Sequence, residues 1–191
     1  MGMEYELKFR ATASVQEKIL RDNPGSWQTL SMETTYYDTP TDALSSRHYT
    51  LRRRLENGKS VCTLKTPAEN GARGEWETEN DSIETAIPIL CKLRNTEELL
   101  SLTREGIVPV CGARFTRRYL TLGFGESTLE LALDEGILFN GNARIPLCEV
   151  EIELKSGSID DANACGLLFR QKYGLEPEHK SKFKRAKELG L

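Results

Sequence analysis

Charged and apolar side chains alternate along the first ten residues of the chain and again in a second segment far along the sequence. Glu4, Glu6 and Lys8 are separated by single aromatic or apolar residues, and the segment 149–155 reads EVEIELK. Successive side chains of a β-strand point to opposite faces, so each segment carries its charges on one face and its apolar groups on the other. A strand pair of this kind is suited to hold metal ions and polyanions.

Eight runs of the chain have strand character, and turn residues separate most of them. Asn57-Gly58 predicts a tight hairpin because both residues accept the positive φ values of such turns. Helical patterns lie at 14–23, 82–104, 158–173 and 178–189, and the second of these, which contains Pro88, is two helices or a kinked one. We therefore expect an α+β fold that is mainly antiparallel. The expected strands are 3–10, 29–37, 47–56, 59–66, 74–80, 113–122, 127–138 and 145–155.

Nearly every expected strand has one charged face, and these faces carry both signs. For a single strand the ordinary explanation is a half-solvated sheet with weak cross-strand ion pairs. Eight such strands have apolar faces that only a few helices can cover, and a closed sheet would also remove exposed edges. The pattern therefore favours an eight-stranded closed β-barrel with charged faces inside and helices packed outside.

The interior of such a barrel cannot be dry, since buried ionised groups need partners. Carboxylate oxygens suit hard cations such as Mg²⁺ and Mn²⁺, while Arg and Lys suit phosphate oxygens. The lining therefore indicates a binding site for a metal-bound oligophosphate.

Bulk composition restricts the remaining classes of protein. The chain has 191 residues, 38% of them hydrophobic, which is enough for one domain (1–191) to bury a core. A net charge of −3 argues against a general nucleic-acid binder. Five cysteines without a C-x-x-C pair, and only two histidines, favour reduced thiols over a zinc site. Since no signal peptide or long apolar run is evident, we expect a cytoplasmic protein that does not enter a membrane.

The segment 4–8 matches E-x-E-x-K, the signature of the triphosphate tunnel metalloenzymes, also called the CYTH superfamily. The resemblance extends over nearly the whole chain and implies an eight-stranded antiparallel tunnel. Segments 115–117, 131–136 and 146–149 are most similar to the bacterial inorganic triphosphatase branch. We do not expect the histidine-rich CHAD domain of some members in these 191 residues. The further segments that carry the resemblance are YYDTP (36–40), LRRR (51–54), TLK (63–65), RGEWE (73–77), FTR (115–117), ELALD (130–134) and the strand 149–153.

The resemblance also implies roles for individual residues. The first choices for metal ligands are Glu4, Glu6 and Glu153, with Glu130, Asp134, Glu149 and Glu151 in support. The residues expected to bind the triphosphate are Lys8, Arg52, Arg54, Lys65, Arg73, Arg117 and Lys182. The catalytic set is Glu4, Glu6, Lys8, Arg52, Arg54, Lys65 and Arg117.

Two positions, Lys182 and Phe115, leave an alternative open. A solvated basic face on the last helix explains Lys182 equally well. Phe115 stands where many members have Lys, so one phosphate contact is missing or is supplied from elsewhere. Three other residues are expected to lie away from the chemistry: Arg53 at the outer surface, and Tyr36 and Tyr37 as packing residues, although one of these tyrosines could face the site.

The resemblance predicts a metal-dependent hydrolase that uses Mg²⁺ or Mn²⁺ and releases orthophosphate from a short triphosphate. Inorganic tripolyphosphate is the first choice of substrate, ahead of thiamine triphosphate and nucleoside triphosphates. Two alternatives stay open, a class IV adenylyl cyclase and a non-catalytic module that binds polyphosphate or nucleotides. The expected partner is thus a small-molecule triphosphate, neither a nucleic acid nor a membrane. Whether the protein forms a homodimer is left open.

Overall fold

The computed structural model describes residues 2–67 and 73–190, and its strands form one ten-stranded antiparallel sheet. The strand order is β1-β6-β5-β4-β3-β7-β8-β9-β2-β10. The strands are β1 (Gly2–Glu4), β2 (Glu6–Arg10), β3 (Gln28–Asp38), β4 (Thr50–Glu56), β5 (Lys59–Pro67), β6 (Arg73–Glu79), β7 (Val108–Phe124), β8 (Ser127–Asn140), β9 (Ala143–Ser156) and β10 (Glu176–Pro177). The helices are α1 (Ala13–Asp22), η1 (Ser45–Arg47), α2 (Ile83–Arg94), α3 (Glu98–Leu102), α4 (Ile159–Tyr173) and α5 (Lys182–Glu188).

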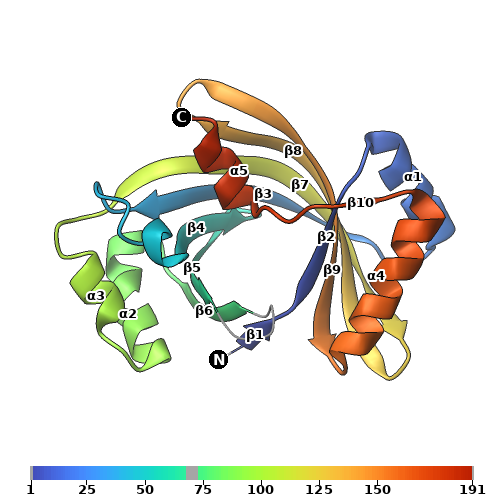
Figure 1. Ribbon diagram of the computed structural model, residues 1–191, viewed down its shortest axis with the longest axis horizontal. Coiled ribbons are helices and arrows are strands. Elements are labelled where there is room, and N and C mark those ends of the chain that lie inside the picture. The colour runs from blue at the N-terminus through green and yellow to red at the C-terminus, as the bar shows by residue number, and fades with distance from the viewer. Residues whose placement is uncertain (1, 68–72, 191) are drawn as a thin grey trace.

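The N-terminal segment joins the two ends of this sheet. β1 pairs with β6, whereas β2 pairs with β9, and only Tyr5 separates β1 from β2. The Tyr5 carbonyl also accepts a hydrogen bond from the backbone N–H of Leu154 at 2.9 Å. The eight expected strands are therefore present, with the first divided at Tyr5, and they surround a central space that Figure 1 views end-on. The predicted antiparallel, barrel-like architecture with outer helices is confirmed. The sheet is not a closed barrel as predicted, because among the described residues β1 and β10 are end strands in the pairing, and only the covalent link through Tyr5 joins the β6 side to the β9 side.

Local signals account for most of the connections. Asn57 and Gly58 have φ values of 50° and 87°, which is the conformation that the predicted hairpin needs. The segment 82–104 forms two helices, and the break falls at Asn95, which is left-handed (φ 57°), while Pro88 lies inside α2. The last helix starts at Lys182 instead of 178, because Glu176 and Pro177 pair with β2 and Ser181 caps the helix. β10 was not predicted, since a two-residue strand carries no periodic signal.

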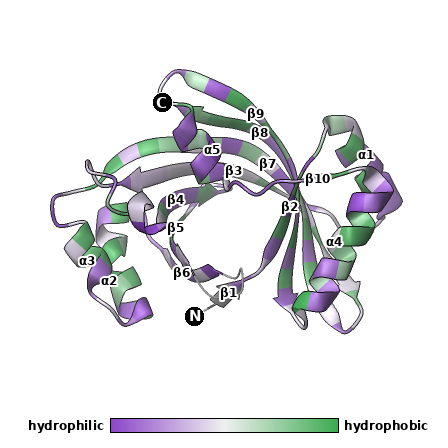
Figure 2. Ribbon diagram, in the orientation of Figure 1, coloured by the Kyte–Doolittle hydropathy of each residue, from purple (hydrophilic) through white to green (hydrophobic). Residues whose placement is uncertain are grey.

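Three hydrophobic clusters lie between the sheet and the helices. One cluster packs Leu131 and Ile152 of the sheet against α1 and α4, and a second packs Leu64 of β5 against α2 and α3. The third packs Phe183 of α5 against β7 and β8. Figure 1 shows α2 and α3 outside the strands at the left, α1 and α4 outside them at the right, and α5 at a rim. Figure 2 shows that these helices combine hydrophobic and hydrophilic residues, as outer helices of a globular protein do.

α5 is attached to the loop after β3 through a buried carboxylate. Asp38, which is 0% exposed, accepts hydrogen bonds from the backbone N–H groups of Thr39 and Leu44 at 2.8 and 2.9 Å. The Lys187 ammonium of α5 lies 3.1 Å from the same carboxylate and 2.6 Å from Asp42. Burial alone would raise the pKa of Asp38, but its hydrogen bonds, including that from Lys187, hold it below the ordinary value of 3.8.

We expect Asp38→Asn to lower the free energy of unfolding by about 1–3 kcal/mol at pH 7, because a charged acceptor of several hydrogen bonds is lost. A folded-state pKa below the unfolded value stabilises the fold at neutral pH, and that stabilisation disappears as the pH falls through the folded-state pKa. The deficit of the variant should therefore shrink at pH 3. Urea unfolding followed by circular dichroism at pH 7 and pH 3 measures it.

Asp42→Asn is the matched control, since Asp42 contacts the same lysine but its side chain is 58% exposed. Its effect should stay within about 0.5 kcal/mol at both pH values. A deficit for Asp38→Asn that is equally large at pH 3 would show that the carboxylate charge is not what stabilises this attachment.

None of the helices in the two described stretches, 2–67 and 73–190, has the length and apolar character needed to cross a membrane.

Candidate functional site

The charged faces of the strands enclose a cavity of about 310 Å³. It is lined mainly by polar side chains, and the residues come from both ends of the sequence as well as from β3 to β9. The structure thus brings together residues that the sequence places up to 179 positions apart. The predicted site residues that line the cavity are Glu4, Glu6, Lys8, Arg52, Arg54, Lys65, Arg73, Arg117, Glu130, Glu151, Glu153 and Lys182.

Strand register explains why the acids gather on one wall. Glu6 pairs with Glu153 across β2 and β9, and Glu153 pairs with Glu130 across β9 and β8. Lys8 likewise pairs with Glu151. Directly opposed residues of antiparallel strands share a face. The charged side chains of β2, β9 and β8 therefore face the same cavity.

The pKa values of the carboxylates at this wall are shifted in different directions. Burial raises the pKa of Glu4, and the nearby Lys65 offsets this only in part. Burial likewise raises the pKa of Glu153, opposed by a hydrogen bond from Lys155. Burial and Glu151 would raise the pKa of Glu6, but nearby lysines, Lys8 above all, lower it overall. Carboxylates that are costly to ionise without further positive charge favour a cation nearby.

The basic residues of the cavity are paired with these acids. The Lys8 ammonium lies 3.0 Å from Glu6, and Lys65 is hydrogen-bonded to Glu4 and lies 3.2 Å from Glu75. The Arg52 guanidinium lies 3.6 Å from the same Glu75. Each sign therefore neutralises the other within the cavity, which limits the cost of enclosing so many charges.

Two predicted metal ligands, Asp134 and Glu149, do not line the cavity. Both are 0% exposed. Arg117 donates two hydrogen bonds to Asp134, from Nε at 2.8 Å and from a terminal nitrogen at 2.7 Å, and it also bonds Glu151. The oxygens of Asp134, Glu149 and Glu151 lie within 4.8 Å of one another, a spacing that could suit a metal ion.

Sequence reasoning omitted several residues that the structure adds to the site. Glu75 and Glu77 share the parity of Arg73 on β6, and Lys155 shares the parity of Glu153 on β9, so strand alternation was the signal that could have found them. Arg185, which pairs with Glu149, carried no such signal because it lies on α5.

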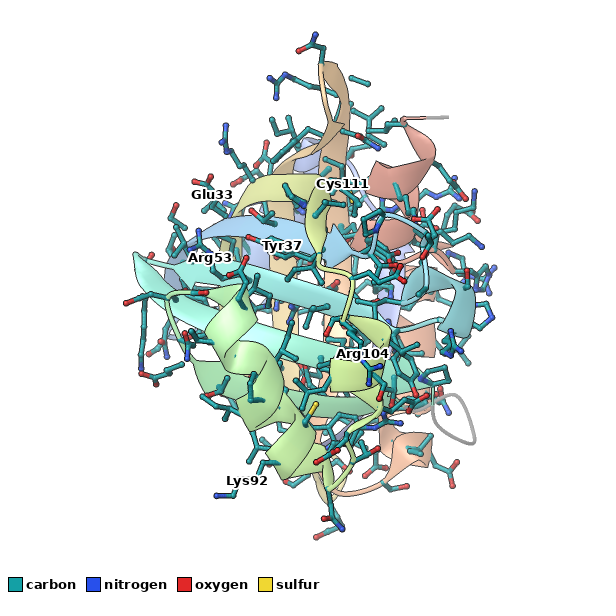
Figure 3. The ribbon with its side chains drawn as sticks, turned by 90° about the vertical axis from the view of Figure 1, so that its left-hand side faces the viewer. Glu33, Tyr37, Arg53, Lys92, Arg104 and Cys111 are labelled. Carbon is teal, nitrogen blue, oxygen red and sulfur yellow. The ribbon has the colours of Figure 1, made fainter. Side chains whose placement is uncertain are left out.

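The residues expected away from the chemistry divide between the two faces of the sheet. Tyr36 lines the cavity and is buried, whereas Tyr37 and Arg53 lie on the outer face beside α2, as Figure 3 shows. Arg53 donates a hydrogen bond to the Asp81 carbonyl at 2.7 Å there. The parity argument that placed Arg53 outside is in agreement with this position.

Comparison with known proteins shows which family the chain belongs to. Residues 2–186 match the CYTH domain. The chain belongs to the CYTH domain family. This CYTH chain is 32% identical over 136 residues to the inorganic triphosphatase of Haemophilus influenzae, in a match that covers 70% of this chain and 39% of that protein. It is 36% identical over 76 residues to the putative triphosphatase YjbK of Bacillus subtilis, covering 37% of this chain and 39% of that protein.

The matched regions span about two fifths of the length of these two relatives. Among solved structures, the CYTH chain is similar to HpAC1 from Hippeastrum, with a TM-score of 0.65 at 19% identity over 98% of this chain and 96% of that one. HpAC1 is described as a putative adenylyl cyclase with a dominant triphosphatase activity. At this level of identity the similarity shows a common fold.

Proposed function

We propose that this CYTH protein hydrolyses a short triphosphate in a metal-dependent reaction, with inorganic tripolyphosphate as the first candidate substrate. The observation that carries the proposal is the cavity itself, which carboxylates and basic side chains line together. An anion-binding module would need the basic residues but not the carboxylates, which repel an anion unless a cation accompanies it. The names of the matched relatives support hydrolysis of triphosphates over other reactions of this fold.

The carboxylates fit a hard divalent cation such as Mg²⁺ or Mn²⁺. One oxygen of Glu4, Oε2, is buried and has no hydrogen-bond partner among the described residues, and Glu6 and Glu153 line the same cavity. Oxygen ligands of this kind are those that Mg²⁺ and Mn²⁺ prefer. When bound, the ion polarises phosphate oxygens and lowers the pKa of bound water. We assign Glu4, Glu6 and Glu153 as the residues that would hold it.

The basic side chains would bind and orient the phosphates. Arg52, Arg54 and Arg73 offer planar guanidinium groups that donate to phosphate oxygens, while Lys8 and Lys65 supply compact positive charges. In the transition state, charge spreads over the oxygens of the transferred phosphoryl group, and fixed positive groups stabilise that charge. These residues come from β2, β4, β5 and β6, so their geometry is set by the sheet.

Binding would exchange one set of ion pairs for another. Lys8 and Lys65 now pair with the carboxylates of Glu6 and Glu4. In the complex, these lysines would instead contact phosphate oxygens, and the carboxylates would contact the cation. The cation alone would add positive charge to the cavity, and the triphosphate alone would add negative charge. We therefore expect the metal and the triphosphate to bind with positive cooperativity.

Product analysis tests the proposed reaction. Purified protein with Mg²⁺ or Mn²⁺ is incubated separately with tripolyphosphate, thiamine triphosphate and ATP, and the products are separated by ion-exchange chromatography. We expect orthophosphate from tripolyphosphate, and no release when EDTA is present. Cyclic AMP and pyrophosphate from ATP would instead identify a cyclase, and tight binding of tripolyphosphate without product would identify a binding module.

A further inference from the structure

Three buried carboxylates, those of Asp134, Glu149 and Glu151, form a cluster on β8 and β9. The oxygens of Asp134, Glu149 and Glu151 meet within 4.8 Å. Asp134 and Glu149 are opposed across β8 and β9, and the buried Gln16 amide donates to the backbone carbonyls of both, at 3.0 and 2.8 Å. The backbone that carries these acids is therefore fixed on both strands.

The space between the three carboxylates is filled by the side chain of Lys182. Its ammonium nitrogen lies 2.8 Å from Asp134, 2.6 Å from Glu149 and 2.6 Å from Glu151. The same nitrogen lies 5.4 Å from the centre of the Phe115 ring. An ammonium group has three N–H donors, and here three carboxylates surround it with an aromatic face beside them.

The cluster is balanced in charge by residues of the protein itself. Besides Lys182, Arg117 pairs with Asp134 and Glu151, and Arg185 pairs with Glu149. Three basic groups thus face three acids. A divalent cation added to this set would leave two uncompensated positive charges in a buried place, which is strongly unfavourable.

We propose that Asp134, Glu149 and Glu151 form a lysine cage, which binds the Lys182 ammonium, docks α5 against the barrel and keeps divalent cations out. The metal ion of the proposed function is then held by Glu4, Glu6 and Glu153. This division follows from their ion pairs. Each cage acid contacts both Lys182 and an arginine. Among the described residues, Glu4, Glu6 and Glu153 each pair with a single lysine, and all three line the cavity.

The cage also determines how α5 covers the cavity. Lys182 is the first residue of α5, and the hydroxyl of Ser181 accepts a hydrogen bond from the backbone N–H of Lys184 at 3.1 Å. One residue further, Phe183 packs against Tyr36 with ring centroids 5.2 Å apart. Asp134 and Glu149 are accordingly positioning residues, which act on the site through Lys182 and Arg117.

The number of Mn²⁺ ions bound per protein and the thermal stability of variants test the cage. The variants are Glu149→Gln, Lys182→Met and the double variant, with Lys184→Met as the control because Lys184 is an exposed lysine on the same helix. Binding of Mn²⁺ alone is titrated by electron paramagnetic resonance. We expect Glu149→Gln to change the Mn²⁺ dissociation constant by less than about twofold. Lys182→Met should lower the Tm by several degrees and bind one Mn²⁺ more than the wild type. The double variant should lose that additional ion.

Weakening of the wild-type Mn²⁺ affinity by tenfold or more in Glu149→Gln would overturn the proposal, as would an unchanged Mn²⁺ count in Lys182→Met. The inference rests on the proposed function only for the choice of ion. Both readouts work without substrate or turnover. A protein that fails to hydrolyse any triphosphate would therefore still confirm or refute the cage.

Discussion

Glu4→Gln and Glu6→Gln are each expected to lower kcat for tripolyphosphate by at least about 100-fold and to leave the fold intact. Gln keeps the shape of Glu but removes the negative charge that the proposed metal site requires. Since burial raises the pKa of Glu4, the neutral amide should cost little stability there. Steady-state orthophosphate release, Mn²⁺ binding and thermal unfolding of both variants measure the three parts of this prediction.

The control for these variants is Glu79→Gln on β6. The Glu79 side chain is 66% exposed and pairs with Lys59 at the surface, outside the cavity. Its kcat should stay within about twofold of wild type, since surface pairs contribute little. Full activity in both Glu4→Gln and Glu6→Gln would remove these residues from the metal site.

Arg117→Met is expected to cost about 3–5 kcal/mol of unfolding free energy, because it leaves buried carboxylates without their counter-ion. Arg117 holds Asp134 with two hydrogen bonds and also contacts Glu151. Burial alone would lower the pKa of Arg117, but these carboxylates raise it well above its ordinary value, so the side chain stays charged. Denaturant titration at pH 7 gives the free energy of unfolding.

Arg114→Met on the same strand is the matched control. The Arg114 side chain is 57% exposed and lies 3.1 Å from Glu33, which is itself half exposed. Its loss should stay within about 1 kcal/mol. Equal losses in the two variants would mean that the buried network around Asp134 is no stronger than a surface ion pair.

Strand alternation was sufficient to place most of the charged residues of the cavity lining on one face of their strands. The parity of Glu4, Glu6 and Lys8 placed them on one face, and the same rule separated Arg52 and Arg54 from Arg53. This succeeds because a period of two is a property of the strand backbone and needs no knowledge of neighbours. Glu75 and Lys155 have the same parity as residues assigned to the site, and they were missed because no role was assigned to them.

The same rule could not distinguish acids that face the cavity from acids that are sealed behind it. Glu149, Glu151 and Glu153 have identical parity, yet Glu149 is 0% exposed and pairs with Arg185, while Glu153 lines the cavity. What separates them is α5, which covers one end of the sheet. The position of a helix relative to a sheet depends on packing between segments far apart in the chain.

The amino-acid sequence by itself determined that the strands are antiparallel, that each has a charged face and that acids and bases of the E-x-E-x-K kind share it. Only the tertiary structure decided which acids meet a lysine and which face open space. Asp134 and Lys182 are 48 residues apart, and their ion pair at 2.8 Å exists because α5 docks against the barrel. Alternation is local to each strand, whereas the pairing of charges is a property of the assembled fold.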